Sequence, residues 1–463
     1  LNTQYSILNT QYSILNTKQN MRIKILSTSI LLILFFCCID QTYSQTRIGV
    51  ILPLMENSEN PEDRVLGEEI LKGITDALDE YNSSDTLNNI IIKTEDTRRD
   101  PARVLELIDM MGNDTNIKAI IGPVFSSEIS SNAGAPAFHK IPLITPTATQ
   151  NFLAADNQYI IQLNPTYETR GKLMGRYATR ELNLNRFLIL SEETYGIKYA
   201  GAFTSEVLKA RGSVLSTQYF KVDESDLDSV LNELKSAMIS KEKFIDFGKL
   251  SAEQIQKYRS MNFVFSNTDS LVGSGDIVSI YKIFGSRADR VVDSAGIKTF
   301  SITKPDPNRN YIYGAAEAIY IPVSNPEKIN LILPALRNAG INLPVIGTSD
   351  WNNEMILNDN SEYIIRLYFE SDYYLKDELK KDLSGKSETA EKNYYMGYDA
   401  MKLVAKQISE GNNTRGKIYD AMQKVTGFKA VHINYTIKNR SNHEMMIMKF
   451  ENGRLEMAGE YVY

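Results

Sequence analysis

Short apolar runs alternate with helical patterns along most of this 463-residue chain. Residues 46–54 (TRIGVILPL) form a largely apolar run of the type that is buried on both faces of a parallel sheet. Residues 66–81 follow with apolar side chains at helical spacing, and residues 117–121 (IKAII) form a further apolar run. Strands that alternate with helices in this way predict a doubly wound α/β lobe built on a parallel sheet.

One helix boundary is marked directly. Asp100 and Pro101 provide a carboxylate at the N-cap position and a proline at the first helical position, which is the preferred way for a helix to begin. Val104, Leu107 and Ile108 then place apolar side chains on one face. These residues predict a helix that begins at Pro101.

A second series of such units begins near residue 165. Apolar runs at 186–191 and 214–220 are followed by helical patterns at 199–210 and 226–238. A chain of this length is too long for one ordinary hydrophobic core. The sequence therefore predicts two α/β lobes.

Residues 240–309 carry less clear patterning and more charge, and we expect them to form an insertion that decorates the second lobe. Regular alternation returns in residues 313–351. A helix is predicted there from Pro326 to Asn338, closed by Gly340.

The overall composition is that of an ordinary globular protein, with 43% apolar and 23% charged residues. The formal net charge is −6. Binding of nucleic acid requires a basic face that neutralises phosphates, so this charge balance argues against a nucleic-acid partner.

The first 44 residues have a different character. Residues 1–20 repeat the heptad LNTQYSI and are interpreted as translated upstream sequence, because the repeat never returns. Residues 21–44 combine a basic start, an apolar stretch and small residues before Gln45, which is typical of a signal peptide cleaved after Ser44. Lipoprotein processing at Cys37 or Cys38 is less favoured, because the residue before a lipidated cysteine is normally small. We therefore expect an exported, periplasmic protein.

Both cysteines lie in that segment, so the mature chain holds neither a disulfide nor a cysteine metal site. The three histidines, His139, His432 and His443, are widely separated in the sequence. They provide little material for a zinc site or a Ser-His-Asp triad. We expect no cofactor, no metal and no enzymatic activity.

Hydroxyl-bearing and small side chains follow two of the apolar runs, where each predicted strand ends. Ser126 and Ser127 follow residues 117–121, and Thr147 to Thr149 follow residues 141–144. Such residues are also common in ordinary turns, and this reading stays open for any single position. In an open α/β sheet, however, ligands bind beyond the carboxyl ends of the strands. The two groups are thus candidates for the walls of one binding site.

The order of these motifs resembles the type I periplasmic solute-binding proteins of the leucine/isoleucine/valine-binding family. The resemblance rests on GPVFSS (122–127), IPLITPTAT (141–149), ETYG (193–196) and NAGINLPVIG (338–347), and extends over most of residues 46–463 apart from 240–309. Residues 318–351 also resemble the binding-protein-like domain of penicillin-binding protein activators.

The resemblance implies two doubly wound lobes joined by a hinge with three chain crossings. The crossings are expected near Asn164–Thr166, Glu370–Tyr374 and Phe428–Ile433. One lobe then comprises residues 46–164 plus 372–427, and the other comprises residues 165–371 plus 428–463.

The resemblance also implies a ligand site. Ser126, Thr147 and Thr149 occupy ligand-contacting positions of the first lobe, with donors for a carboxylate and one carbonyl for an ammonium. In the second lobe a strict count places the acidic residue at Ser349, but we favour Asp350, because only a carboxylate compensates a desolvated ammonium. The expected ligand-binding residues are Ser126, Ser127, Thr147, Ala148, Thr149, Tyr195 and Asp350.

Two departures from the family pattern weaken the prediction of a branched amino acid. Leu66 stands where an aromatic residue is common, and residues 321–326 (IPVSNP) contain no aromatic residue.

The expected function is a monomeric, exported solute-binding protein that delivers a small amino-acid-like ligand to a membrane ABC transporter. The alternative is a ligand-free or ligand-sensing regulatory module of a cell-envelope enzyme. An exported hydrolase is disfavoured, because the many serines lack a base.

Overall fold

The computed structural model describes residues 46–84, 89–260, 275–374 and 388–463. The upstream repeat, the predicted signal peptide and both cysteines lie outside the described residues. From Thr46 to Tyr463 the chain forms one compact unit.

The first lobe is built on a seven-stranded sheet with the order β16-β17-β5-β4-β3-β1-β2. Strands β1 to β5 pair in parallel, in register such as Ile48↔Ile92 and Ile121↔Ile144. The strands are β1 (Thr46–Leu52), β2 (Ile90–Asp96), β3 (Ile117–Ile121), β4 (Leu143–Thr145), β5 (Ile160–Gln162), β16 (Ile437–Lys438) and β17 (Ser441–Asn442). Several of their apolar side chains, such as Ile48 and Ile120, are fully buried, which is why these runs are continuous in the sequence.

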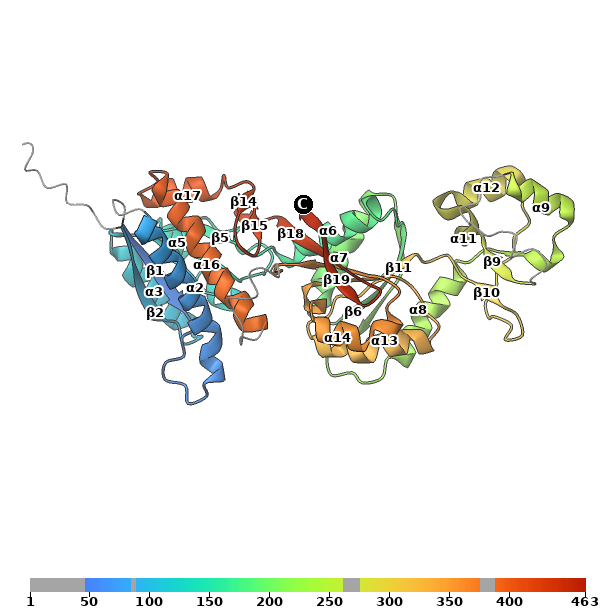
Figure 1. Ribbon diagram of the computed structural model, residues 1–463, viewed down its shortest axis with the longest axis horizontal. Coiled ribbons are helices and arrows are strands. Elements are labelled where there is room, and N and C mark those ends of the chain that lie inside the picture. The colour runs from blue at the N-terminus through green and yellow to red at the C-terminus, as the bar shows by residue number, and fades with distance from the viewer. Residues whose placement is uncertain (1–45, 85–88, 261–274, 375–387) are drawn as a thin grey trace, which may run out of the picture. The chain divides into compact units, whose positions relative to one another are not determined.

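Helices connect and cover these strands. Asp100 caps α3 as predicted, its side chain accepting a hydrogen bond from the backbone N–H of Ala102. Helices α2 and α16 lie side by side (Figure 1), with Gly73 of α2 facing the backbone of Tyr394 of α16. The helices of this lobe are α2 (Glu62–Ser84), α3 (Pro101–Asn113), α4 (Ser126–Ser130), α5 (Ala135–Phe138), α16 (Glu388–Ser409) and α17 (Arg415–Met422).

The second lobe has its own seven-stranded sheet, with the order β19-β18-β13-β12-β11-β6-β7. Its strands are β6 (Arg186–Glu192), β7 (Ser213–Phe220), β11 (Ala318–Tyr320), β12 (Val345–Gly347), β13 (Leu367–Ser371), β18 (Glu444–Glu451) and β19 (Arg454–Val462). The first five are parallel to one another, while β18 is antiparallel to β13 and to β19. Its helices are α6 (Tyr167–Arg180), α7 (Gly196–Lys209), α8 (Asp228–Ser240), α13 (Ile329–Asn338) and α14 (Glu354–Asp359), with 3-10 turns η3 (Pro326–Lys328), η4 (Ser349–Trp351) and η5 (Ser361–Tyr363).

Residues 244–312, which include most of the predicted insertion 240–309, contain a separate three-stranded sheet, β10-β9-β8. Its buried apolar residues, among them Ile245, Val278 and Ile283, form a core cluster of their own. The segment contains β8 (Phe244–Asp246), η1 (Phe247–Lys249), α9 (Ala252–Arg259), β9 (Ile277–Ser279), α11 (Ile280–Phe284), η2 (Gly285–Arg287), α12 (Ala288–Ala295) and β10 (Tyr311–Ile312).

The chain passes three times between the two large sheets, after β5, after β13 and after β17. The sequence placed the last passage near Phe428–Ile433, and this boundary is wrong. Residues 437–442 form β16 and β17, and Ser441 pairs in parallel with Gln162 of the first sheet. Residues 428–435 form only the small hairpin β14 (Phe428–Lys429) and β15 (Asn434–Tyr435), so the last passage lies between Asn442 and Glu444.

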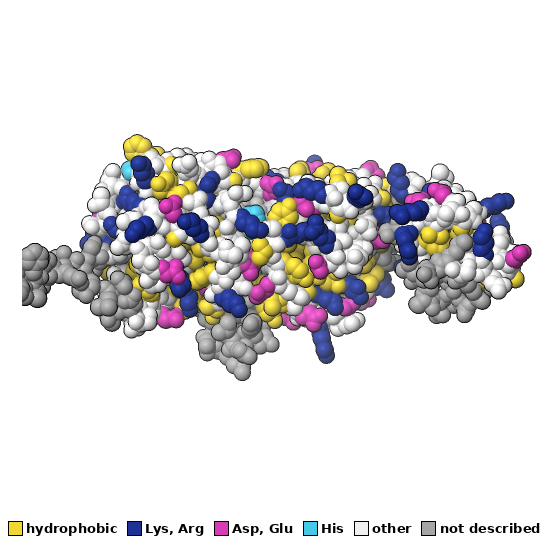
Figure 2. Space-filling view, turned by 90° about the horizontal axis from the view of Figure 1, so that it is seen from above, with side chains coloured by type: hydrophobic (Ala, Val, Ile, Leu, Met, Phe, Trp, Pro, Cys, Tyr) yellow, Lys and Arg dark blue, Asp and Glu magenta, His cyan; other side chains and the backbone are white. Residues whose placement is uncertain are grey.

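On the face seen in Figure 2, Lys and Arg side chains are interspersed with Asp and Glu side chains. Across the described ranges, no helix is both long enough and apolar enough to cross a membrane.

Candidate functional site

A cavity of about 500 Å³ lies where residues of both lobes and of two chain crossings meet. All seven residues expected at the ligand site line it. The first lobe contributes Leu66, Val124, Phe125, Ser126, Ser127, Thr147, Ala148, Thr149, Lys392, Asn393 and Met396. The second lobe contributes Tyr167, Arg170, Tyr195, Tyr199, Ser349 and Asp350, and the crossings contribute Asn164 and Asp372.

The first-lobe wall consists of the loops that follow β3 and β4. Gly122 makes the turn after β3 with φ +100°, and a Cβ there would lie 1.9 Å from the carbonyl oxygen of Ile51. Ser126 joins the two loops, because its Oγ accepts hydrogen bonds from the backbone N–H groups of Thr149 and Gln150, both at 3.3 Å. The Ser126 hydroxyl proton is not used in these contacts and is available to a ligand.

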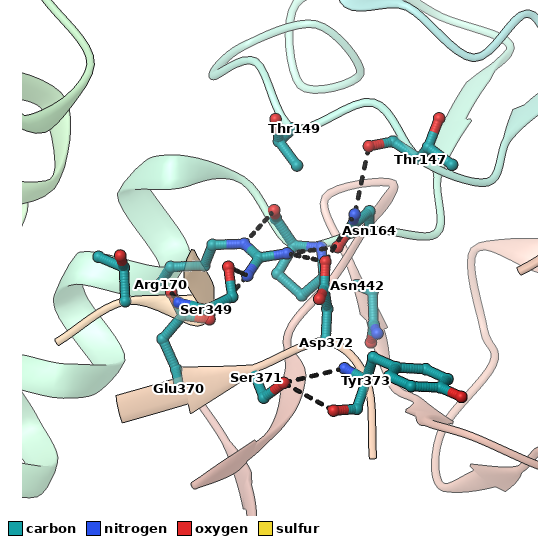
Figure 3. A network of polar contacts seen from close by, with 12 residues as sticks. Thr147, Thr149, Asn164, Arg170, Ser349, Glu370, Ser371, Asp372, Tyr373 and Asn442 are labelled. Carbon is teal, nitrogen blue, oxygen red and sulfur yellow. Dashed lines mark hydrogen bonds and ion pairs between the residues drawn. The ribbon is translucent and has the colours of Figure 1, made fainter. Parts of the chain in front are cut away.

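Thr147 has a more structural role than expected. Its Oγ1 donates a hydrogen bond of 2.6 Å to the carbonyl of Val124, so the hydroxyl proton is already engaged. Its carbonyl accepts a hydrogen bond of 3.2 Å from Nδ2 of Asn164 (Figure 3). The carbonyl of Thr149 likewise accepts from the backbone N–H of Tyr167 at 3.1 Å.

Ala148 is 2% exposed, and its carbonyl accepts a hydrogen bond of 3.2 Å from Nε2 of Gln162. One carbonyl of Thr147 to Thr149 was expected to face a ligand ammonium, and each of these three carbonyls already has one donor. The Thr149 hydroxyl differs, because it makes no hydrogen bond within the described part of the chain. On this wall, Ser126 and Thr149 are the hydroxyls best able to donate to a ligand carboxylate.

The second-lobe wall carries Asp350. The residue lies in η4, directly after β12, and its Oδ2 accepts a hydrogen bond of 2.5 Å from the hydroxyl of Tyr195. The hydroxyl oxygens of Tyr195 and Tyr199 lie 3.1 Å apart. Burial raises the pKa of Asp350, and the hydrogen bond from Tyr195 and the more distant Lys392 offset this only in part. The carboxylate is thus desolvated without a direct cationic partner.

Trp351, the only tryptophan, belongs to the core and not to the cavity wall. It is fully buried, and its Nε1 donates a hydrogen bond of 2.9 Å to the carbonyl of Ile321. Ser349, on the other side of Asp350, does line the cavity, and its hydroxyl accepts a hydrogen bond of 3.1 Å from Arg170.

Arg170 of α6 is the centre of a polar network at the chain crossings (Figure 3). Its side chain is 1% exposed. All five N–H donors of its guanidinium are engaged. Their acceptors are the carbonyl of Pro165 at 3.1 Å, Ser349 Oγ at 3.1 Å, Glu370 at 2.7 Å, Asn164 Oδ1 at 2.6 Å and Asp372 at 2.7 Å. Arg170 therefore holds the first two crossings together and has no donor left for a ligand.

The carboxylates of this network titrate in opposite directions. Burial raises the pKa of Glu370 to about 7, even though Arg170 favours its charged form. Burial would also raise the pKa of Asp372, but Lys392 and Arg170 outweigh it and hold that pKa well below its ordinary range. At neutral pH Asp372 is charged and Glu370 is partly protonated.

Lys392 places a cation on the cavity wall. Its Nζ lies 2.6 Å from Asp372 Oδ1, and its side chain is 31% exposed. Sequence reasoning missed both Lys392 and Arg170, because a charged residue normally lies on the solvated surface. For Lys392, the sequence offered as a signal its position shortly after the second expected crossing, Glu370–Tyr374.

Among the described residues, no group of three or more His, Cys, Asp and Glu side chains is arranged to hold a metal ion.

Comparisons with known proteins agree with this architecture. Residues 45–241 match the family model described as periplasmic binding protein. No curated protein sequence matches the chain.

Several solved structures share the fold across nearly their whole length. A putative branched-chain amino acid ABC transporter protein from Rhodospirillum rubrum is 14% identical with a TM-score of 0.62, covering 89% of this chain and 99% of that one. The leucine binding protein LivK from Thermotoga maritima is 17% identical with a TM-score of 0.53, covering 90% and 99%. A solute binding protein from R. palustris in complex with 4-hydroxybenzoate is 13% identical with a TM-score of 0.54, covering 90% and 97%. The chain thus has the type I periplasmic binding protein fold. Over residues 45–241 the family match confirms the expected resemblance to periplasmic binding proteins.

Proposed function

We propose that the chain is an exported, monomeric solute-binding protein that captures a small amino-acid-like zwitterion between its two lobes and delivers it to a membrane ABC transporter. One observation carries the proposal. Free hydroxyl donors on one wall, Ser126 and Thr149, and a desolvated carboxylate on the other, Asp350, line the same 500 Å³ cavity.

The charges of this cavity match the two ends of an α-amino acid. A ligand carboxylate receives hydrogen bonds from the hydroxyls of Ser126 and Thr149, and charge-assisted bonds of this kind are stronger than neutral ones. A ligand ammonium lies against Asp350, whose raised pKa reflects burial without a direct cation partner. The ammonium provides the charge that this carboxylate lacks.

The position of the cavity also suits capture by closure. A ligand held by residues of both lobes makes its full set of contacts only when the lobes are closed, so binding shifts the population toward the closed state. We further propose that residues 21–44 act as the export signal and that Gln45 begins the mature protein.

The 4-hydroxybenzoate bound by the R. palustris protein has a carboxylate but no ammonium. An acid of that type would use the Ser126 and Thr149 wall and leave Asp350 unpaired. We therefore favour an amino acid over a simple organic acid.

A melting-temperature screen tests the proposal. Protein freed of ligand by unfolding and refolding is scanned with amino acids, organic acids, sugars and short peptides. A ligand present at one hundred times its dissociation constant adds about 2.7 kcal/mol of stability, which such a scan detects. We expect at least one α-amino acid to raise the melting temperature.

Two variants test the assignment of the walls. Thr149→Ala and Asp350→Asn should each weaken binding about tenfold or more, because each leaves a charged ligand group without a buried partner. Asp359→Asn, an exposed carboxylate on the same lobe, is the matched control and should bind as the wild type does. If no compound of the screen stabilises the refolded protein, the solute-binding function is wrong and a ligand-free regulatory module of a cell-envelope enzyme takes its place.

A further inference from the structure

One end of the cavity is formed by the first turns of α16, and it is polar. Lys392, Asn393 and Met396 line it, beside Leu66 of α2. This wall is fixed in place, because α16 and α2 approach each other at two glycines. A Cβ at Gly73 would lie 1.9 Å from the carbonyl oxygen of Tyr394, and one at Gly397 would lie 2.1 Å from that of Ile70.

The groups that would hold the α-carboxylate and the ammonium lie elsewhere, on the loops after β3, β4 and β12. The proposed function therefore leaves the α16 end of the cavity for the ligand's side chain. An aliphatic side chain would have Leu66 and Met396 as partners, but it would also desolvate a lysine ammonium and an amide without compensation.

Lys392 has N–H donors that no described residue accepts. A lysine ammonium carries three N–H groups, and among the described residues Lys392 Nζ has one acceptor, Asp372 Oδ1 at 2.6 Å. Asp372 does not depend on this contact alone, because its other oxygen accepts from both Arg170 and Asn164. The side chain is 31% exposed and lines the cavity, so two of its donors can reach a ligand.

The charge balance around Lys392 favours an anion. Arg170 is shared between Glu370 and Asp372, and burial raises the pKa of Glu370 to about 7. Burial favours the protonated form of Glu370, so within this network Arg170 and Lys392 are not fully neutralised by Glu370 and Asp372. The cavity thus presents a negative group, Asp350, on the second lobe and a positive group, Lys392, on the first.

We propose that the ligand carries a second anionic group, a side-chain carboxylate that binds Lys392 Nζ beside the amide of Asn393. The substrate class is then an acidic α-amino acid. This inference rests on the proposed function and names the ligand class for the same cavity.

The test compares acidic amino acids with their amides by titration calorimetry on refolded protein. L-glutamate and L-aspartate are the acidic probes, and L-glutamine, L-asparagine and L-leucine are the neutral ones. The wild type should bind one acidic probe about tenfold or more tightly than its amide, since a charge-assisted hydrogen bond is lost in the amide.

Lys392→Gln is the informative variant. It should lower affinity for the acidic probe about tenfold or more and change affinity for the amide by less than about threefold, so the preference for the acid disappears. Lys402→Gln removes a lysine further along α16 that pairs with Glu80 and does not line the cavity, and it should leave both affinities unchanged.

Each remaining outcome overturns the inference in a distinguishable way. If Lys392→Gln weakens binding of the acidic probe and of its amide equally, Lys392 only holds Asp372 in position at the hinge and does not contact the ligand. Preference of the wild type for leucine or an amide would refute the acidic ligand and leave the solute-binding function standing. Absence of binding by every amino acid would refute both proposals.

Discussion

Asp350 is a partly buried carboxylate that has no direct cationic partner among the described residues. Burial raises its pKa, and its nearest partner is the neutral hydroxyl of Tyr195. Only the ionised form attracts an ammonium, so affinity should fall as the pH drops from neutral through the raised pKa of Asp350 toward the ordinary carboxyl range near roughly 4.

Calorimetric dissociation constants measured across this pH range check the prediction. Asp350→Asn should bind the ligand weakly at every pH, and its affinity should no longer fall as the pH is lowered. A wild-type affinity that stays constant down to the acid range would mean that Asp350 does not contact the ammonium.

Glu370 should make the stability of the protein depend on pH. Its pKa is about 7 in the folded protein because of burial, against 4.5 for an ordinary glutamate. Between these values the folded state binds a proton that the unfolded state has lost, so the free energy of unfolding should decrease as the pH rises from about 4.5 to about 7. The expected decrease is roughly 1–3 kcal/mol.

Urea unfolding of the wild type and of Glu370→Gln at several pH values measures this slope. The variant also loses the ion pair with Arg170, so the comparison concerns the change with pH and not the absolute stability. Glu362→Gln, an exposed glutamate in η5, is the control and should keep the wild-type slope. Equal slopes for wild type and Glu370→Gln would contradict the prediction.

At the scale of elements, the packing of α2 on α16 positions one end of the cavity. Gly73 and Gly397 allow the two helices to approach at backbone distance, which no side chain would permit. Gly397→Ala should force the helices apart, lower stability by about 1–3 kcal/mol or more and displace Lys392 and Met396.

Melting temperature and ligand affinity, measured together, test this. Gly201→Ala in α7 is the matched control, because a Cβ there meets nothing within 4 Å. An alanine in an open helical position should stabilise the protein by roughly 0.5–1 kcal/mol. If Gly397→Ala melts and binds like the wild type, the close approach of α2 and α16 does not determine the site.

At the scale of the whole molecule, the segment from β8 to β10 is separable from the binding site. It has its own sheet and its own core cluster, and none of its described residues lines the cavity. Replacement of residues 244–312 by a short Gly-Ser linker should leave ligand affinity within about threefold of the wild type, because none of the described residues that it replaces lines the cavity.

Calorimetry on the shortened protein, with circular dichroism to establish that it folds, measures this. The deletion retains Glu242, whose Oε1 accepts hydrogen bonds from the backbone N–H groups of Gly314 and Ala315 at the base of the segment. A loss of affinity beyond tenfold in a folded shortened protein would show that the segment contributes to binding.

The sequence by itself determined the α/β architecture and the loops that form the first-lobe wall. Apolar runs such as residues 117–121 are local signals that predict strands. Because ligands bind beyond the carboxyl ends of parallel strands, the predicted strands also locate the binding site. This reasoning predicted that Ser126 and Thr149 would come together, and the resemblance to the solute-binding family added Tyr195 and Asp350. All four residues line one cavity.

Only the tertiary structure decided the rest. The short strands β16 and β17 could not be predicted from hydrophobic periodicity, because two residues cannot show an alternation. The pairing of β17 with β5 places the last crossing after β17. Arg170 and Lys392 look like ordinary surface charges on helices until Asp372 is folded against them, 202 positions from Arg170 and 20 positions from Lys392 in the sequence. A buried charge is recognised by its partners, and those partners are set by long-range contacts that no local pattern contains.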